Sequence, residues 1–468
     1  MTDLRAMFDS GDLGGIDEDA LAAFVSDRRW YGSRDQTITR AAVIDTIAIS
    51  DDPALAIALV EVGFHSGAHE LYQLMLGLRP ADGPPETTVW SVGADDVYEA
   101  FDDPRHLQVV VAHIRSSATF GQDPVVEFRS AVGADRLDPI PGHPHPAGRE
   151  QSNTSVVFDD RMILKCYRRL EPGINPEVEV LRFLAAHDFA HTPPLLGWFE
   201  HRGPPLDATL GMLQHYQAGA QDGWELVTAA LRDGRSDQVL PAIERLGAVT
   251  GHLHATLAAE RTDPAFVPEE VRPEGLALMS AALDELTNDV FANLPDDPIL
   301  APIAGRADDI RDRLRGVSKS TGLGRKIRVH GDLHLGQALW GDEEWHLIDF
   351  EGEPARPATE RRRKRSPLRD VAGLLRSLDY AAGATRLHSG ADVPAHWVSA
   401  ARTALLDGYF AVVESTGLLP PTSAVTDEVL GLYELEKAVY ELRYEIAHRP
   451  GWVAIPVAAI DALLEGTP

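Results

Sequence analysis

The sequence has a single cysteine, little positive charge and no long apolar segment. Cys166 has no second cysteine to pair with inside the chain, so nothing calls for an oxidising compartment. The 43 Lys and Arg residues stand against 72 Asp and Glu residues, a net charge of −29, which disfavours nucleic acid or an anionic membrane as the main partner. No apolar run reaches the length of about 18 residues that a spanning helix needs, and the N-terminal segment lacks the pattern of a signal peptide. We therefore expect a soluble cytoplasmic protein with neither a nucleic acid nor a membrane as partner.

The order of the predicted elements divides the chain into a strand-rich front half and a helix-rich back half. Its 468 residues are enough for two or three packed units. Stretches rich in Pro and Gly at 81–86 and 139–150 predict loops. We expect a cap at 1–90, a nucleotide-binding lobe at 91–211 and a helical lobe at 212–468. The alternative is that the cap and the nucleotide-binding lobe share one continuous sheet, with no boundary at 81–86.

Apolar periodicity predicts the elements that would carry functional side chains. Two short strands, 154–158 and 161–167, are joined by two aspartates, which is typical of a hairpin. A helix at 176–187 follows, with Asn175 as its N-cap. In the back half we expect four long helices and two short strands: helices at 241–259, 273–288, 397–413 and 427–448, and strands at 327–330 and 344–350.

The strongest chemical signal is HGDLHLGQ at 330–337, followed by LIDFEGEP at 347–354. Phosphoryl transfer from a nucleotide needs an acceptor for the hydroxyl proton and oxygen ligands that hold Mg²⁺ against the phosphates. The two segments match the kinase pattern H-x-D-x-x-x-x-N … D-F-G, except that Gln and Glu replace the Asn and the Gly. An amide oxygen one methylene further out still reaches a metal. We expect Asp332 to be the proton acceptor, with Gln337 and Asp349 as metal ligands.

Two other interpretations of this segment are weaker. His330 and His334 are four residues apart, which suits a metal pair on a helix. Gly331 and Gly336 predict that the segment is not helical, and cysteine ligands are absent, so we do not expect zinc. The remaining alternative is a surface loop rich in His and Asp.

The second signal is EQSNTSVVFDDRMILKCYRR at 150–169. Lys165 lies on the second strand of the predicted hairpin, where a nucleotide kinase places the lysine that holds the phosphates. The turn lacks G-x-G-x-x-G, so hydroxyl, amide and backbone N–H groups of four consecutive residues would contact the phosphates instead: Ser152, Asn153, Thr154 and Ser155. Glu179 or Glu177 on the next helix can pair with Lys165, and we expect Glu179 because it lies further into the helix.

Together these segments resemble the eukaryotic-like kinase superfamily in its aminoglycoside-phosphotransferase branch, and more closely the bacterial maltokinases. The resemblance covers most of the chain, including RRWYGSR near the start, SPLRDVAGLLRS after the metal motif and YELRYEIAHRPGW near the end. It implies an α+β, bilobal eukaryotic-like kinase fold with an N-terminal cap domain. It also implies ATP and Mg²⁺ as cofactors and a small-molecule sugar as acceptor.

The reaction implied by the resemblance is phosphorylation of the anomeric hydroxyl of maltose, giving maltose 1-phosphate for α-glucan (glycogen) synthesis. Members of the same group use glucosamine, so glucosamine or another amino sugar or aminoglycoside is the alternative acceptor. A non-catalytic nucleotide-binding scaffold is a further alternative, against which the presence of the base, the metal ligands and the lysine argues. Association with other α-glucan enzymes, and the choice between a monomer and a homodimer, stay open.

The resemblance also suggests binding residues outside the two motifs. It places the adenine-binding hinge at Gln214, His215 and Tyr216. The predicted C-terminal helix carries tyrosines and charged residues that suit a sugar site, because aromatic faces pack on sugar C–H surfaces and charged groups bind hydroxyls. An ordinary amphipathic helix that packs its tyrosines explains the same pattern equally well. The basic run at 361–366 is expected to be a solvated loop, and RRWYGSR a packing motif of the cap. The candidates for sugar contacts are His330, Lys437, Tyr440, Glu441, Tyr444, Glu445 and Trp452.

Overall fold

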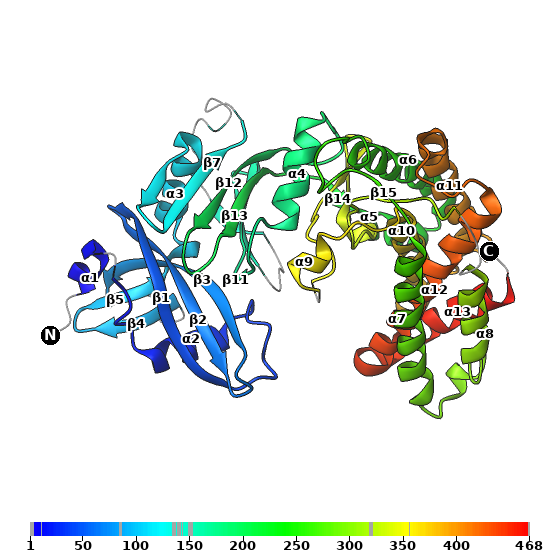
Figure 1. Cartoon of the computed structure of the whole chain (residues 1–468), viewed down its shortest axis with the longest axis horizontal. Coiled ribbons are helices and arrows are strands. Elements are labelled where there is room, and N and C mark those ends of the chain that lie inside the picture. Colours follow the sequence, from blue (N-terminus) through cyan, green and yellow to red (C-terminus); the bar gives the residue numbers. More distant parts are fainter. Residues whose placement is uncertain are drawn as a thin grey trace. The chain divides into compact units, whose positions relative to one another are not determined.

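A computed structural model describes residues 4–10, 12–83, 87–132, 137, 142, 144–147, 153–317, 322–354 and 356–466 (Figure 1). Most of the expected loop at 139–150, part of that at 81–86, and Ser152 lie outside the described residues. The chain forms two compact units. Unit 1 comprises Met1–Ala185 and Pro193–Ala218, and unit 2 comprises Ala186–Thr192 and Gly219–Pro468. Among the described helices, none is long and apolar enough to cross a membrane.

The first sheet of unit 1 is antiparallel and runs in the order β1-β2-β3-β5-β4, with β11 paired to β3. Two helices, α1 (Leu4–Ser10) and α2 (Glu18–Asp27), precede it. Trp30 and Tyr31 of RRWYGSR are buried against the sheet, which confirms a packing role for that motif. The strands are β1 (Ile38–Asp51), β2 (Ala54–Phe64), β3 (His69–Pro80), β4 (Thr88–Val92), β5 (Asp95–Glu99) and β11 (Arg169–Leu170).

The second sheet of unit 1 has the order β6-β7-β12-β13-β10-β9-β8. The two sheets are separate, but β2 is buried on both faces, and residues such as Ile57 share a core with Phe128 and Leu164 of the second sheet. The strands thus form two sheets and not one continuous sheet, but β3 and β4, on either side of 81–86, lie in the same sheet, so no boundary separates them there. The elements are η2 (Ala100–Asp102), α3 (Pro104–Ser116), β6 (Thr119–Gly121), β7 (Val125–Ser130), β8 (Pro144–Pro146), β9 (Thr154–Phe158), β10 (Met162–Cys166), α4 (Pro176–Ala186), β12 (Leu195–Arg202) and β13 (Ala208–His215).

Two expected boundaries fall inside strands. Residue 90, where we expected the cap to end, lies inside β4, and the first sheet continues to Glu99. Residue 212, the expected start of the helical lobe, lies inside β13. By contrast, the hairpin of β9 and β10 is confirmed: its two aspartates, Asp159 and Asp160, have φ of 47° and 52°, as a type I′ turn requires.

Unit 2 is mostly helical, with a three-stranded sheet in the order β14-β17-β18 and a two-stranded sheet of β15 and β16. The four long helices expected from periodicity are confirmed. At Gly247 on α6 a Cβ atom would collide with the backbone of α11, so glycine lets these helices pack closely. The helices are α5 (Gly223–Arg232), α6 (Leu240–Leu257), α7 (Pro273–Ala292), α8 (Ala307–Val317), α9 (Ala358–Arg361), α10 (Leu368–Ser389), α11 (Trp397–Val413), α12 (Ser423–His448) and α13 (Ala454–Glu465). The strands and short 3₁₀ helices are β14 (Gln221–Asp222), η4 (Ser236–Val239), β15 (Glu269–Glu270), η5 (Pro298–Leu300), β16 (Arg325–Lys326), η6 (Leu335–Gln337), β17 (Ala338–Gly341), β18 (Glu344–Leu347), η7 (Glu414–Thr416) and η8 (Pro450–Trp452).

The strand expected at 327–330 is wrong. Ile327 makes a single bridge to Arg365, and the chain then leaves the strand conformation. The backbone N–H groups of His330 and Gly331 donate to the side chain of Asp370, so they are not available to a neighbouring strand.

Candidate active site

The loop at 330–337 is held by a buried carboxylate on α10. Asp370 is 2% exposed and accepts the N–H of His330 at 2.8 Å and that of Gly331 at 3.0 Å. Nε2 of His254, on α6, lies 3.1 Å from the same carboxylate, and Nδ1 of His254 lies 3.0 Å from the hydroxyl of Tyr409 on α11. Burial alone would raise the pKa of Asp370, but the hydrogen bonds from His254 and from Gly331 hold it below its ordinary value. Asp370 is therefore a carboxylate that positions the loop.

His330 supports the loop from inside. Its side chain is 1% exposed, Nε2 lies 2.8 Å from the carbonyl oxygen of Ile348, and the ring packs on Phe350 with a centroid distance of 4.8 Å. The N–H of Asp332 points to Nδ1 of His330 at 3.4 Å. This pattern suits an imidazole with the proton on Nε2. His330, expected as a sugar contact, is not among the described residues that line the cavity beside Asp332.

Asp332 opens onto a cavity of about 470 Å³ within unit 2. Its side chain is 28% exposed, and Nζ of Lys437, on α12, lies 3.7 Å from its Oδ1. Lys437, Tyr440 and Glu441 line this cavity as expected from the sequence. The other lining residues are Ala282, Leu283, Leu286, Gly331, Leu333, Glu353, Pro354, Arg356, Arg369, Asp370, Tyr433, Glu436 and Arg443.

Arg369 joins two of the cavity's carboxylates. Its guanidinium lies 2.8 Å from Glu436 and 3.3 Å from Glu353, and Glu353 also accepts a hydrogen bond from Arg356. Although burial alone would lower the pKa of Arg369, Glu436 and Glu353 raise it above its ordinary value. The pKa of Glu353, which burial alone would raise, is lowered by Arg369 and Arg356. Both carboxylates are therefore already paired with Arg369.

Glu441 is paired as well. Nη2 of Arg376, a residue 1% exposed on α10, lies 2.7 Å from Oε2 of Glu441. Burial raises the pKa of Glu441 even though Arg376 opposes the shift. Together with the contact of Lys437 to Asp332 and that of His254 to Asp370, every carboxylate among the described cavity-lining residues has a cationic or imidazole partner.

Three candidates on the C-terminal segment lie outside the described lining of the cavity. Tyr444 is 43% exposed on α12. Glu445 is buried and accepts hydrogen bonds from Tyr380 at 3.1 Å and from Arg449. Trp452 stacks on Tyr380 with a centroid distance of 6.2 Å. Glu445 thus has a structural role, tying α12 to α10.

The two expected metal ligands meet at the β17–β18 hairpin. Nε2 of Gln337 lies 3.0 Å from Oδ2 of Asp349, and the N–H of Ile348 donates to the carbonyl of Gln337 at 3.0 Å. Asp349 has φ of 64°, a left-handed conformation that is uncommon outside glycine. The side-chain N–H of Gln337 donates to Asp349, and the carboxylate and the amide also carry oxygen atoms of the kind that Mg²⁺ prefers, so these residue types fit such an ion.

The basic run at 361–366 is not the solvated loop that we expected. Nη1 of Arg361 donates to the carbonyl of Glu351 at 2.9 Å, and its side chain is 9% exposed. Nζ of Lys364, with a side chain 8% exposed, lies 2.8 Å from Glu269. Both cations therefore have partners outside the run, and Arg361 ties the run to the turn after Asp349.

Lys165 in unit 1 pairs with Glu177, and the expected pairing with Glu179 is wrong. Nζ of Lys165 lies 3.0 Å from Oε2 of Glu177, which also accepts a hydrogen bond from Tyr167 at 3.0 Å. Lys165 and Glu177 are 8% and 2% exposed. Asn175 caps α4 by accepting the N–H of Glu177 at 2.8 Å, which places Glu177 in the first turn, near the hairpin.

The register of the hairpin determines which face of the sheet each expected phosphate-binding residue occupies. Ser155 pairs with Lys165 across the strands and shares its face of the sheet. Thr154 alternates to the other face, where its Oγ1 accepts a hydrogen bond from Arg168 at 2.8 Å. Asn153 directly precedes β9, and the position of Ser152 lies outside the described residues.

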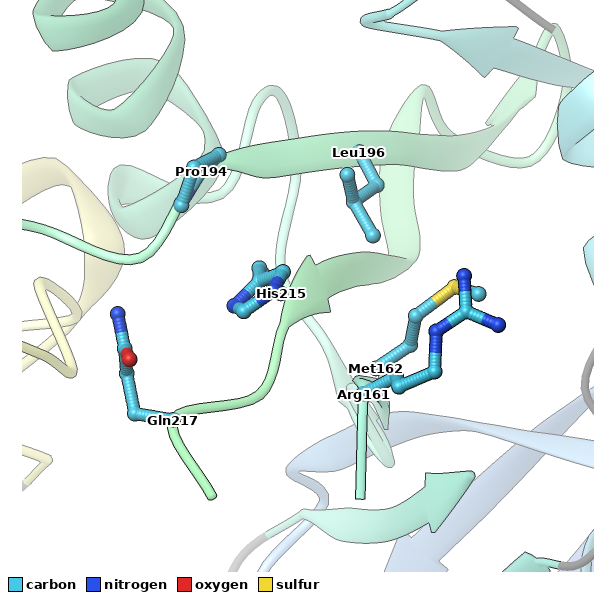
Figure 2. Close-up of a pocket in the computed structure, with 6 residues that line it drawn as sticks. All are labelled: Arg161, Met162, Pro194, Leu196, His215 and Gln217. Atoms are coloured by element: carbon cyan, nitrogen blue, oxygen red, sulfur yellow. The ribbon is translucent and has the colours of Figure 1, made fainter. Parts of the chain in front are cut away.

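The hinge candidates lie at the end of β13. Gln214 is buried, and its Nε2 donates to the carbonyl of Pro193 at 2.8 Å. His215 is the cross-strand partner of Met162, on the face opposite to Lys165. There it lines a pocket of about 410 Å³ with Arg161, Met162, Pro194, Leu196 and Gln217 (Figure 2). Tyr216 follows, and its N–H donates to the carbonyl of Arg161 at 2.8 Å.

The sequence reasoning missed Asp370, His254, Glu353, Arg369 and Glu436. A signal exists for Asp370 alone: it is an acid on the same buried helix face as apolar residues such as Val371 and Leu374. Such a residue is rarely buried without partners. The others are polar residues whose meeting depends on how three helices and a loop pack.

Two family models match the chain. The model described as the phosphotransferase enzyme family matches residues 142–402, more than half of the chain, and that of the maltokinase N-terminal cap domain matches residues 24–103. A glucosamine kinase of Streptacidiphilus jiangxiensis is 28% identical over 329 residues, covering 67% of this chain and 72% of that protein. A glucosamine kinase of Mycolicibacterium smegmatis is 27% identical over 332 residues, with 69% and 80% covered.

A solved structure shares the fold over almost the whole chain. It is a glucosamine kinase in complex with glucosamine, ADP and inorganic phosphate, with a TM-score of 0.72 and 22% identity. The alignment covers 96% of this chain and 100% of that one. The kinase fold with an N-terminal cap domain, expected from the sequence, is confirmed.

Proposed function

The chain belongs to the phosphotransferase enzyme family, and from that premise we propose that it transfers the γ-phosphoryl group of ATP to the anomeric hydroxyl of maltose. Membership makes it a phosphotransferase with a hydroxyl acceptor. The cap domain of maltokinases and the similarity to two glucosamine kinases support a sugar as that acceptor. The ADP in the related solved structure supports an adenine nucleotide as donor.

The observation that carries maltose is the charge balance of the cavity beside Asp332. A protonated amino sugar brings an ammonium group, which needs a carboxylate of its own when it leaves water. Glu353 and Glu436 already pair with Arg369, and Glu441 pairs with Arg376. A neutral sugar needs only hydrogen bonds, which such paired groups still offer through their remaining lone pairs and N–H groups.

The size of the cavity agrees with this choice. Its volume of about 470 Å³ lies within the range of roughly 300–1,000 Å³ for small-molecule sites. Tyr433 and Tyr440 supply aromatic surface, while arginines and carboxylates supply hydrogen bonds. That combination of apolar faces and polar edges suits a disaccharide.

The proposed roles follow from the contacts of each residue. Asp332 accepts the proton of the anomeric hydroxyl, and Asp370 positions it by holding the two residues before it. Lys437, 3.7 Å from Asp332, is proposed to orient the acceptor. Lys165, fixed by Glu177, is proposed to bind the donor's phosphates.

Asp349 and Gln337 are proposed to hold Mg²⁺. Bound there, the ion would neutralise negative charge on the phosphates. Arg361 holds the turn that follows Asp349 through the carbonyl of Glu351, and so limits how far that carboxylate can move.

Glucosamine is the second candidate, because both known relatives named above carry that activity in their names. Initial rates with Mg–ATP and a series of acceptors, namely maltose, glucose, glucosamine, trehalose and an aminoglycoside, separate the two. We expect kcat/KM for maltose to exceed that for glucosamine by about 10²-fold or more, because the wrong sugar leaves buried polar groups unpaired. Turnover of glucosamine without turnover of maltose would overturn maltose as the acceptor.

Asp332→Asn is the matched control for this assay. The change should lower kcat on the preferred sugar by roughly 10²- to 10⁴-fold while nucleotide binding persists. If Asp332→Asn retained near-full turnover, the assignment of the proton acceptor would be wrong whichever sugar is used.

A further inference from the structure

An exposed row of aromatic side chains runs along α12, made of Tyr440, Tyr444 and His448; we call it the aromatic strip. Tyr440 is 46% exposed and Tyr444 is 43% exposed. Of the large hydrophobic side chains that are exposed in the described part of the chain, these two are the aromatic ones. Aromatic rings are normally buried against other apolar groups, so their exposure side by side calls for a partner.

The aromatic strip continues from the acceptor cavity. Lys437, beside Asp332, is followed by Tyr440, Tyr444 and His448 at intervals of three, four and four residues, which keeps all four on one face of the helix. Tyr440 belongs both to the strip and to the lining of the cavity. At a rise of about 1.5 Å per residue, Tyr444 lies about 10 Å along α12 from Lys437. The strip therefore leads from the proposed proton acceptor out to solvent.

The rings of the strip are held in place by their neighbours. The guanidinium of Arg443 lies 5.4 Å from the ring centroid of Tyr440, and that of Arg449 lies 5.3 Å from that of Tyr444. The rings of Tyr444 and His448 stack at 4.5 Å with an angle of 22°. Side chains that are already ordered lose little entropy when a ligand packs against them.

We propose that the aromatic strip binds the outer glucose units of linear α-glucans longer than maltose. This rests on the proposed function, because a phosphoryl acceptor at the anomeric hydroxyl fixes the reducing-end ring at Asp332. The remaining rings must then lead away from Asp332, and the strip offers exposed aromatic side chains at intervals of about one helical turn. Arg443 and His448 supply hydrogen-bond donors at its edges for sugar hydroxyls.

Binding of maltose and maltotetraose, measured by isothermal titration calorimetry with the nucleotide analogue AMP-PNP and Mg²⁺ present, tests the proposal without relying on turnover. We expect maltotetraose to bind more tightly than maltose. Tyr444→Ala should remove about three- to tenfold of the affinity for maltotetraose and leave the ratio of the two affinities near one. Tyr444→Phe keeps the ring and should keep the preference.

Ile299→Ala provides the matched control, because Ile299 is a comparably exposed apolar residue of the same unit, at 38%, and lies outside the strip. It should change neither affinity. Circular dichroism and thermal unfolding of each variant check that the fold is intact. If Tyr444→Ala does not fold, the ratio of affinities in His448→Ala decides instead.

Three results would overturn the proposal. The first is maltotetraose binding no more tightly than maltose, and the second is an equal loss of affinity for both sugars in Tyr444→Ala. The third is sedimentation showing that Tyr444→Ala dissociates a dimer with no change in sugar binding, which would make the strip a contact between copies of the chain. If instead maltotetraose binding depends on Tyr444 but maltose is not phosphorylated, the strip stands and the proposed reaction fails.

Discussion

Asp370→Asn tests whether one buried carboxylate sets the position of the catalytic loop. Oδ1 of Asp370 accepts the N–H of Gly331, and Oδ2 accepts those of His330 and His254. An asparagine of the same shape has only one oxygen, so its amide N–H₂ must face at least one of these donors. The best arrangement keeps the oxygen at the two-donor side and leaves Gly331 facing another donor.

The free energy of unfolding falls because the hydrogen bond from Gly331 is lost. A hydrogen bond to a charged group, together with a buried donor left unsatisfied, amounts to about 3 kcal/mol. For a unit of the size of unit 2 this corresponds to a fall of about 6–12 °C in its unfolding midpoint. Because Gly331 directly precedes Asp332, a shift of the loop by about 1 Å should lower kcat by about 10²-fold.

The assay combines thermal unfolding with steady-state kinetics on the acceptor that the wild type prefers. Glu434→Gln is the matched control: Glu434 is 3% exposed and forms two hydrogen bonds with Arg402, at 2.7 and 3.1 Å, away from the loop. It should lower stability to a similar extent while kcat stays within a few fold. A stable Asp370→Asn enzyme with wild-type kcat, or an equal loss of kcat in both variants, would refute the reasoning.

Glu177→Gln should weaken the hold on Lys165 and raise KM for ATP, whereas Glu179→Gln should leave KM unchanged. Steady-state kinetics at varied ATP concentration measures both values. Equal effects of the two changes would contradict the pairing of Lys165 with Glu177. Burial lowers the pKa of His106 and of His113, so the unfolded chain binds protons more readily than unit 1 does. The stability of unit 1 should therefore be level above pH of about 6.5, the ordinary pKa of histidine, and decline as the pH falls below it, as thermal unfolding followed from pH 8 to 5 would show. A midpoint that rises on acidification would contradict this sign.

The sequence predicted those features that depend on local patterns. The helix expected at 397–413 runs over Trp397–Val413, because its apolar period is long and uninterrupted. The hairpin at Lys165 follows from two aspartates that tolerate positive φ. The spacing of the kinase motif singles out Asp332 and Asp349, and that spacing can be read from the sequence without knowledge of the fold.

The misses arise from tertiary contacts. Depth in the helix favours Glu179 as the partner of Lys165. The N-cap at Asn175, however, starts the helix so that its first turn, which contains Glu177, reaches Lys165. The strand expected at 327–330 is not formed, because Asp370, 40 residues later, accepts the backbone N–H of its last residue, His330. Interactions between residues so far apart leave no local pattern to read.

The position of the phosphate in the product is the most direct test of the account. After reaction of maltose with Mg–ATP, ¹H and ³¹P nuclear magnetic resonance spectra show which carbon bears the phosphoryl group. The account predicts maltose 1-phosphate, with the phosphorus coupled to the anomeric proton of the reducing-end ring, and a rate of its formation by Asp332→Asn that is lower by roughly 10²- to 10⁴-fold. Phosphate on a primary hydroxyl, or no phosphorylation of maltose by an enzyme that turns over another sugar, would contradict it.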